Sequence, residues 1–156
     1  MKEVAIVSGS RTAIGTFGGG LKDVPVTELG AVVMKDVLKR VNLRQVPNDI
    51  QKDSAPDKLK DQCLTELEKK SYDWNDDAQP VGLDEVVMGN VLQAAQGQNT
   101  ARQSMIGAGI PKETPAYTIN KVCGSGLKAI ALGAASIMLG QAEVVLAGGQ
   151  DRKSVV

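Results

Sequence analysis

The stretch "PAYTINKVCGSGLKAIALGAASIMLG", residues 115–140, places an extended run, a cysteine and a helix pattern in direct succession. Its first part, "AYTINKV", has the alternation of a β-strand, and "GSGLKAIALGAASIMLG" has the length and composition of a helix. Cys123 stands at the junction, just before Gly-Ser-Gly. A cysteine there is either a buried packing residue or a nucleophile, and the local pattern leaves both interpretations open.

The helix expected after Cys123 is apolar on nearly every side. Its apolar residues are Leu127, Ala129, Ile130, Ala131, Leu132, Ala134, Ala135, Ile137, Met138 and Leu139. A helix that is apolar all round is buried all round. A single four-stranded sheet cannot bury it on every side, so we expect a second layer to cover it.

Short apolar runs recur along the rest of the chain. The segments "VAIVS" at 4–8, "EVVMGNVL" at 85–92 and "EVVLAGG" at 143–149 are expected to be strands. Helix patterns separate them, and strands that alternate with helices need crossover connections. The sequence therefore predicts the α/β class, with a mostly parallel mixed sheet and flanking helices.

Two further helices are expected between these strands. Thr27 can cap the first, whose apolar stripe at helical spacing consists of Leu29, Val32, Val33, Val37 and Val41. Asn99 or Thr100 can cap a second, shorter helix that is stopped by Gly109.

The segment at about 45–80 differs from its surroundings, because it is dense in Lys, Asp and Glu and contains several prolines. Residues 58–70 could form one amphipathic helix with Leu59, Cys63 and Leu67 on a shared face. We interpret the segment as a charged surface insertion, a solvated decoration of the domain. Its Tyr72 and Trp74 leave an added binding module as the alternative.

Bulk composition excludes several classes of function. The 156 residues carry no net charge and only 3% aromatic residues, which argues against nucleic acid or an anionic membrane as a partner. No apolar run is long enough to span a bilayer. Cys63 and Cys123 form no CxxC pair, and free thiols favour a reducing compartment such as the cytoplasm. The chain has no histidine, so any histidine base must come from outside it.

The setting of Cys123 suits a nucleophile. The N-terminus of a helix stabilises a negative charge such as a thiolate. Gly124 and Gly126 remove side chains that would crowd the sulfur, and a backbone N–H of the turn can face a developing oxyanion.

A competing motif overlaps this turn. Residues 124–129 satisfy G-x-G-x-x-G/A after a strand and before a helix, which is the dinucleotide-binding pattern. In that fold an acidic residue ends the next strand, whereas Glu143 begins it here. The match is a weak one.

The segment "NKVCGSGLKAI" resembles the nucleophile motif of the thiolase family, and in particular that of its acetyl-CoA acetyltransferases. Further thiolase-like segments follow the family's order: "SGSRTAIGTFGGGLKDV", "TELGAVVMKDVLKR", "DEVVMGNVLQAAQGQNTARQSMIGAGIP" and "EVVLAGGQD". A 3-oxoacyl synthase also has a cysteine at such a turn, but "GQNTARQ" favours a thiolase.

The resemblance implies that Cys123 takes up an acyl group as a thioester. The reaction would join two acetyl-CoA molecules into acetoacetyl-CoA and CoA, or run in reverse. Coenzyme A thioesters would be substrates, with no separate cofactor and no metal. The resemblance also implies a homo-oligomer and a second, similar half that packs over the helix after Cys123.

The sequence departs from the family pattern in residues that a thiolase needs for activity. A complete thiolase carries a catalytic histidine, an asparagine-bound water and a second catalytic cysteine in parts that do not match this chain. We therefore expect residues 1–156 to be an incomplete thiolase N-terminal domain that is inactive alone. A noncatalytic, self-associating fragment is the alternative, and a dinucleotide-binding module is a weaker one.

Other polar residues are expected to have structural roles. Arg11 and Arg102 are expected to form structural ion pairs, with substrate binding as the weaker alternative, and the glycines at 18–20 are expected to turn the chain. Asn120 and Lys121 flank the cysteine turn, where we expect them to shape the strand end or a subunit contact.

Overall fold

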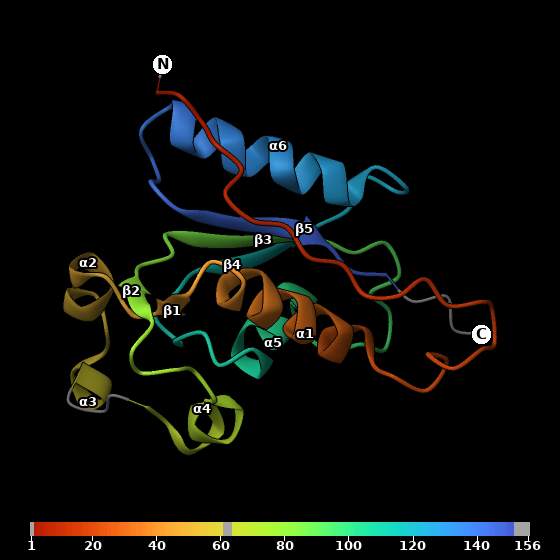
Figure 1. Ribbon diagram of the computed structural model, residues 1–156, viewed down its shortest axis with the longest axis horizontal. Coiled ribbons are helices and arrows are strands. Elements are labelled where there is room, and N and C mark those ends of the chain that lie inside the picture. The colour runs from red at the N-terminus through yellow and green to blue at the C-terminus, as the bar shows by residue number, and fades with distance from the viewer. Residues whose placement is uncertain (1, 61–63, 152–156) are drawn as a thin grey trace.

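A three-stranded parallel sheet lies at the centre of the computed structural model, which describes residues 2–60 and 64–151 (Figure 1). Its strand order is β4-β3-β5, with bounds Ala116–Ile119, Glu85–Gly89 and Val145–Gly149. Val87 of β3 is paired with Tyr117 on one side and Ala147 on the other. The predicted α/β class and parallel sheet are confirmed.

Helices cover both faces of this sheet. α6 (Ser125–Met138) packs on one face against β3 and β5, and α5 (Thr100–Gly107) packs on the other, with α1 (Val26–Lys39) against it (Figure 1). The core between sheet and helices includes Met34, Met88 and Met105, all essentially inaccessible to solvent. None of the helices in the described part of the chain is long and apolar enough to cross a membrane.

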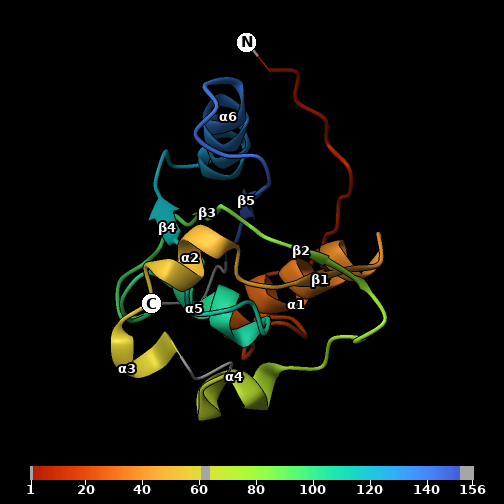
Figure 2. The same cartoon turned by 90° about the vertical axis from the view of Figure 1, so that its left-hand side faces the viewer.

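The strand expected at 4–8 is not formed. This segment runs along the surface apart from β5, and Ile6 is 84% exposed (Figure 2). A strand needs a neighbour for its backbone groups, and no described residue pairs with this one. The segment is anchored at its end, where the Ser8 hydroxyl donates to the Val37 carbonyl over 2.7 Å.

α1 confirms the first expected helix but not its buried face. The helix begins after Pro25 rather than after Thr27. Its buried residues are Val26, Gly30, Ala31, Met34 and Leu38, whereas Val32 of the expected stripe is exposed. Gly30 allows α1 to approach α5 closely, because a Cβ at this position would lie 2.5 Å from the Ser104 hydroxyl oxygen.

α5 and α6 form where their sequence patterns predict helices, but the burial of α6 on every side is not found among the described residues. Asn99 caps α5 by accepting a hydrogen bond from the Arg102 N–H at 3.1 Å, and Gly109 follows the helix in the left-handed conformation. α6 turns Ala129 and Gly133 toward the sheet. Its outward face remains apolar and uncovered by the described residues, with Leu127 76% exposed.

The charged segment contains more structure than expected. β1 (Leu43–Gln45) and β2 (Gln79–Val81) form a small parallel sheet, and the described residues between them form three short helices. These are α2 (Asp49–Asp53), α3 (Asp57–Lys60) and α4 (Glu66–Ser71). The single helix expected over 58–70 is wrong, because α3 ends at Lys60 and Thr65 caps a new helix. Cys63 lies outside the described residues.

Two side chains dock this segment onto the domain. Trp74 is only 6% exposed, and its indole N–H donates to the Gly109 carbonyl at 2.9 Å. Glu68 is also buried and accepts from the Lys112 N–H at 2.7 Å. The interpretation as a solvated decoration is therefore wrong for this part, and Trp74 belongs to the core. That the segment is an insertion stays a prediction.

Acid is expected to weaken this docking through Glu68. Burial opposes its ionisation, but hydrogen bonds from Thr65 and Lys112 outweigh burial and hold its pKa below the ordinary 4.5. Because the pKa of Glu68 is lower in the folded state than in the unfolded state, its ionised carboxylate stabilises the fold at pH values above the unfolded-state pKa. This stabilisation is lost as the pH falls through the folded-state pKa. We expect the urea midpoint to fall between neutral pH and about pH 3.

The variant Glu68→Gln tests this assignment. It should be less stable than the wild type at neutral pH and should lose part of the acid dependence. Glu66→Gln is the matched control, because Glu66 lies on the same helix with its side chain 87% exposed. An acid dependence that is identical in wild type and Glu68→Gln would contradict the assignment.

Candidate active site

The turn between β4 and α6 is fixed by two side chains. Asn120 accepts from the Val122 N–H at 2.8 Å and donates to the Val91 carbonyl at 3.1 Å. The buried Ser125 hydroxyl accepts from the Lys121 N–H at 2.8 Å and donates to the Val122 carbonyl at 2.6 Å. Asn120 thus shapes the strand end, which was one of the two roles expected for it. No sequence pattern predicts the role of Ser125 in holding this turn.

Val122 has an uncommon backbone conformation, with φ of +50°. A β-branched residue in the left-handed region is strained, and such strain persists only where neighbouring contacts impose it. The hydrogen bonds of Asn120 and Ser125 hold Val122 on both sides. The conformation of the turn is therefore set before any ligand arrives.

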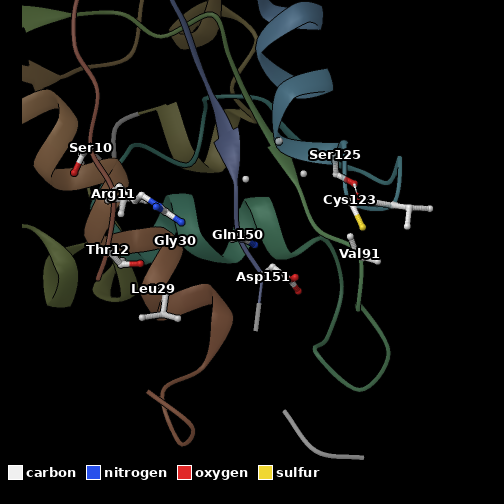
Figure 3. Close-up of a pocket in the computed structure, with 15 residues that line it drawn as sticks. Ser10, Arg11, Thr12, Leu29, Gly30, Val91, Cys123, Ser125, Gln150 and Asp151 are labelled. Atoms are coloured by element: carbon white, nitrogen blue, oxygen red, sulfur yellow. Dashed lines mark hydrogen bonds between the residues drawn. The ribbon is translucent and has the colours of Figure 1, made fainter. Parts of the chain in front are cut away.

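The turn leaves Cys123 exposed as a free thiol directly before α6. Buried packing, one of the two interpretations of this cysteine, does not describe the structure. The sulfur faces a cleft and can be reached by a reagent (Figure 3).

Two glycines bring the start of α6 onto the ends of the strands. A Cβ on Gly89, at the end of β3, would lie 2.4 Å from the Ser125 carbonyl carbon. A Cβ on Gly149, at the end of β5, would lie 3.0 Å from the Gly126 Cα. The backbones are thus in direct contact, and this contact places Cys123 at the carboxyl edge of the sheet.

An open cleft of about 320 Å³ lies at this edge. Its walls come from the loop that precedes α1, from α1 itself, from the ends of β3 and β5, and from the cysteine turn (Figure 3). The side chains of chemical interest are Ser10, Arg11, Thr12, Cys123, Gln150 and Asp151. The carboxyl ends of parallel strands are where open α/β sheets bind their ligands.

Neither arginine forms the expected ion pair. Arg102 is structural, but it donates to the backbone carbonyls of Thr114 and Lys112 at 2.9 and 2.8 Å. Arg11 is exposed and has no ion-pair partner among residues 2–60 and 64–151. Its guanidinium points into the cleft (Figure 3).

Gln150 is a further cleft residue that the sequence reasoning missed. Its carbonyl oxygen accepts from the Ser104 hydroxyl at 2.7 Å, while its amide nitrogen is buried without a partner in the described part of the chain. A signal was present, since Gln150 and Asp151 are polar residues directly after an apolar strand. Such positions lie at the ligand-binding edge of a parallel sheet.

The geometry does not favour the dinucleotide interpretation. The Gly126 backbone packs against Gly149, so this glycine serves the helix–strand contact. Glu143 precedes β5, at the edge opposite to the cleft, where its N–H donates to Asp84 at 2.6 Å.

The family model described as "Thiolase, N-terminal domain" matches residues 4–53 and 48–156. The chain belongs to the thiolase family. It is 44% identical over 154 residues to an acetyl-CoA acetyltransferase of Cupriavidus necator, covering 99% of this chain and 30% of the relative. The acetyl-CoA acetyltransferase of Pseudomonas aeruginosa is 42% identical over 155 residues, with 99% and 30% coverage.

A solved structure agrees with this thiolase membership. The crystal structure of the Bacillus anthracis acetyl-CoA acetyltransferase aligns with a TM-score of 0.64 and 33% identity, over 92% of this chain and 28% of that one. This thiolase chain therefore spans about a third or less of the length of the relatives that it matches.

Proposed function

We propose that the protein is an acyltransferase of the thiolase type, acetyl-CoA C-acetyltransferase, and that Cys123 is its acyl acceptor. The observation that carries this proposal is the exposed thiol in a cleft at the carboxyl edge of the sheet. The names of the relatives support acetyl-CoA as the substrate. A free thiol suits a reducing compartment, and we place the protein in the cytoplasm.

The proposed chemistry has two steps. The Cys123 thiolate attacks the thioester carbonyl of acetyl-CoA, the bond from carbonyl carbon to CoA sulfur breaks, and CoA leaves with a proton. A second acetyl-CoA then loses a methyl proton, and its carbon attacks the acyl-cysteine. A carbon–carbon bond forms, the cysteine thiolate is released, and the product is acetoacetyl-CoA. The exchange of one thioester for another is nearly thermoneutral.

Both proton transfers need acid–base groups, and this chain contains no histidine. Positioned acid–base groups contribute about 10²–10⁴-fold each to a rate. We therefore propose that the chain by itself undergoes slow acylation at Cys123 and forms no measurable acetoacetyl-CoA. Groups for the second step would come from outside these 156 residues.

Timed reaction with acetyl-CoA or iodoacetamide, followed by peptide mass spectrometry, tests the role of Cys123. We expect the Cys123 peptide to be modified first and the modification to vanish in Cys123→Ala. Cys63→Ala is the control, because it removes the other thiol and should leave the reaction unchanged. Preferential modification of Cys63 in the folded protein would overturn the assignment.

The second candidate function is self-association, in which the chain forms a homo-oligomer. It is favoured by the apolar outward face of α6, where Leu127, Ile130 and Met138 are exposed. Large apolar side chains that are exposed together on one helix favour an interaction site. Light scattering at micromolar concentrations should give a mass above that of the monomer. A strictly monomeric mass would contradict the proposal.

A further inference from the structure

We propose that Arg11 is an anion-recognition residue of the Cys123 cleft, which receives a carboxylate or phosphate group of the molecule that reacts with the cysteine. The inference rests on the proposed acyl transfer for the natural identity of that molecule. The recognition itself concerns the charge of any electrophile that enters the cleft, and it can be measured separately.

Arg11 lies across the cleft from the cysteine. It belongs to the loop before α1, whereas Cys123 belongs to the turn before α6, and both line the same cavity of about 320 Å³ (Figure 3). A guanidinium is always charged and presents several donors in a plane that matches an oxyanion. Because no carboxylate of the described residues pairs with it, its charge is available to a ligand.

Hydrogen bonds hold the loop against α1 immediately before Arg11. The Ser10 hydroxyl donates to the Asp36 carboxylate, which also accepts from the Arg40 guanidinium at 2.6 Å. These two hydrogen bonds, in that order of size, hold the pKa of Asp36 below its ordinary value, so the clamp persists at neutral pH. Ser8 adds a hydrogen bond to the Val37 carbonyl. Arg11 is therefore pre-positioned at the cleft wall.

Gln150 provides an independent indication of a ligand. Its side chain lines the cleft and is only 6% exposed. Its carbonyl oxygen is occupied by Ser104, whereas its amide nitrogen has no partner among the described residues. Buried donors are almost always satisfied in native proteins, and an unpartnered one next to a cleft indicates a missing acceptor. Gln150 and Arg11 line the same cavity, so an acceptor that carries negative charge would suit both residues.

Asp151 is the opposing charge in the cleft. It forms no ion pair with Arg11 within the described ranges, so the two charges act separately on a ligand. Removing one or the other should therefore shift the selectivity of the cleft in opposite directions. A general loss of structure would not shift the selectivity in opposite directions in the two variants, so the pair of variants tests the proposal specifically.

The experiment compares alkylation of Cys123 by iodoacetate and iodoacetamide, which differ in charge but react alike. In both cases the thiolate forms a carbon–sulfur bond and displaces iodide. The measured quantity is the ratio of the iodoacetate rate to the iodoacetamide rate. We expect Arg11→Gln to lower this ratio about three-fold or more and Asp151→Asn to raise it. Both shifts should shrink in high salt.

Two further variants keep the test specific. Arg11→Lys keeps the charge and should retain most of the ratio. Lys22→Gln removes one positive charge from the same loop at an exposed side chain that does not line the cleft, and it should leave the ratio unchanged. A ratio that is the same in wild type and Arg11→Gln, with both folded by circular dichroism, would overturn the proposal. So would an equal loss in Lys22→Gln.

Thioester donors then distinguish the two sources of the anion. Acetyl-CoA, acetyl-pantetheine and succinyl-pantetheine present phosphates, no charge and an acyl carboxylate, respectively. If acetyl-CoA acylates Cys123 faster than acetyl-pantetheine does, and Arg11→Gln removes this difference, Arg11 binds a phosphate. If the same holds for succinyl-pantetheine, Arg11 binds the acyl carboxylate. If no thioester acylates Cys123, the acyltransfer proposal fails, while the alkylation ratio still decides the role of Arg11.

Discussion

Replacing Gly89 by alanine is expected to destabilise the protein by about 1–3 kcal/mol and to slow the modification of Cys123. The new Cβ would lie 2.4 Å from the Ser125 carbonyl carbon and 2.6 Å from the Gly126 nitrogen. These are backbone atoms, so no rotamer change can relieve the overlap. The first turn of α6 would have to move away from β3, and the cysteine turn would move with it.

Urea unfolding followed by circular dichroism measures the first effect, and timed alkylation measures the second. Gly20→Ala is the matched control, because a Cβ at Gly20 meets nothing within 4 Å and its φ is not positive. It should change the unfolding free energy by less than about 0.5 kcal/mol. A Gly89→Ala protein with the stability of the control would show that the contact between β3 and α6 is more compliant than the structure indicates.

Replacing Trp74 by alanine is expected to cost about 3–5 kcal/mol of unfolding free energy. The substitution empties a large buried site and leaves the Gly109 carbonyl without its donor at 2.9 Å. Trp74→Phe separates the two contributions, since it keeps much of the ring but removes the indole N–H. We expect that variant to lose a smaller amount than alanine does. Urea midpoints from circular dichroism check both variants, and near-wild-type stability of Trp74→Ala would contradict the core position of this residue.

The sequence predicts correctly those elements whose burial depends on residues close to them in the chain. The apolar run of β3 and the capped α5 are examples: α5 formed where expected, and β3 formed over the first five residues of the strand expected at 85–92. The segment 4–8 has an equally strong strand pattern, yet it is not a strand, because strand formation depends on a partner elsewhere in the chain. The burial of Trp74 likewise depends on Gly109, which is 35 residues away.

The candidate site shows the same division. The position of Cys123 before a helix followed from its neighbours in sequence, and the structure agrees. Arg11 and Gln150 could not be assigned to that site, because only the folded chain brings the loop before α1 and the end of β5 to one cleft. Ser125 was overlooked since its hydroxyl braces the turn through contacts that a motif does not encode.

Trp74 is the sole tryptophan of the chain, and it sits where the charged segment meets the domain core. Lys39 lies 5.9 Å from the centre of its ring on one side, and the Gly109 carbonyl binds its indole N–H. Its intrinsic fluorescence is therefore a built-in optical reporter of that one junction. The emission of a buried, hydrogen-bonded indole differs from that of a hydrated one, so the fluorescence of Trp74 reports the environment of this junction without an added dye.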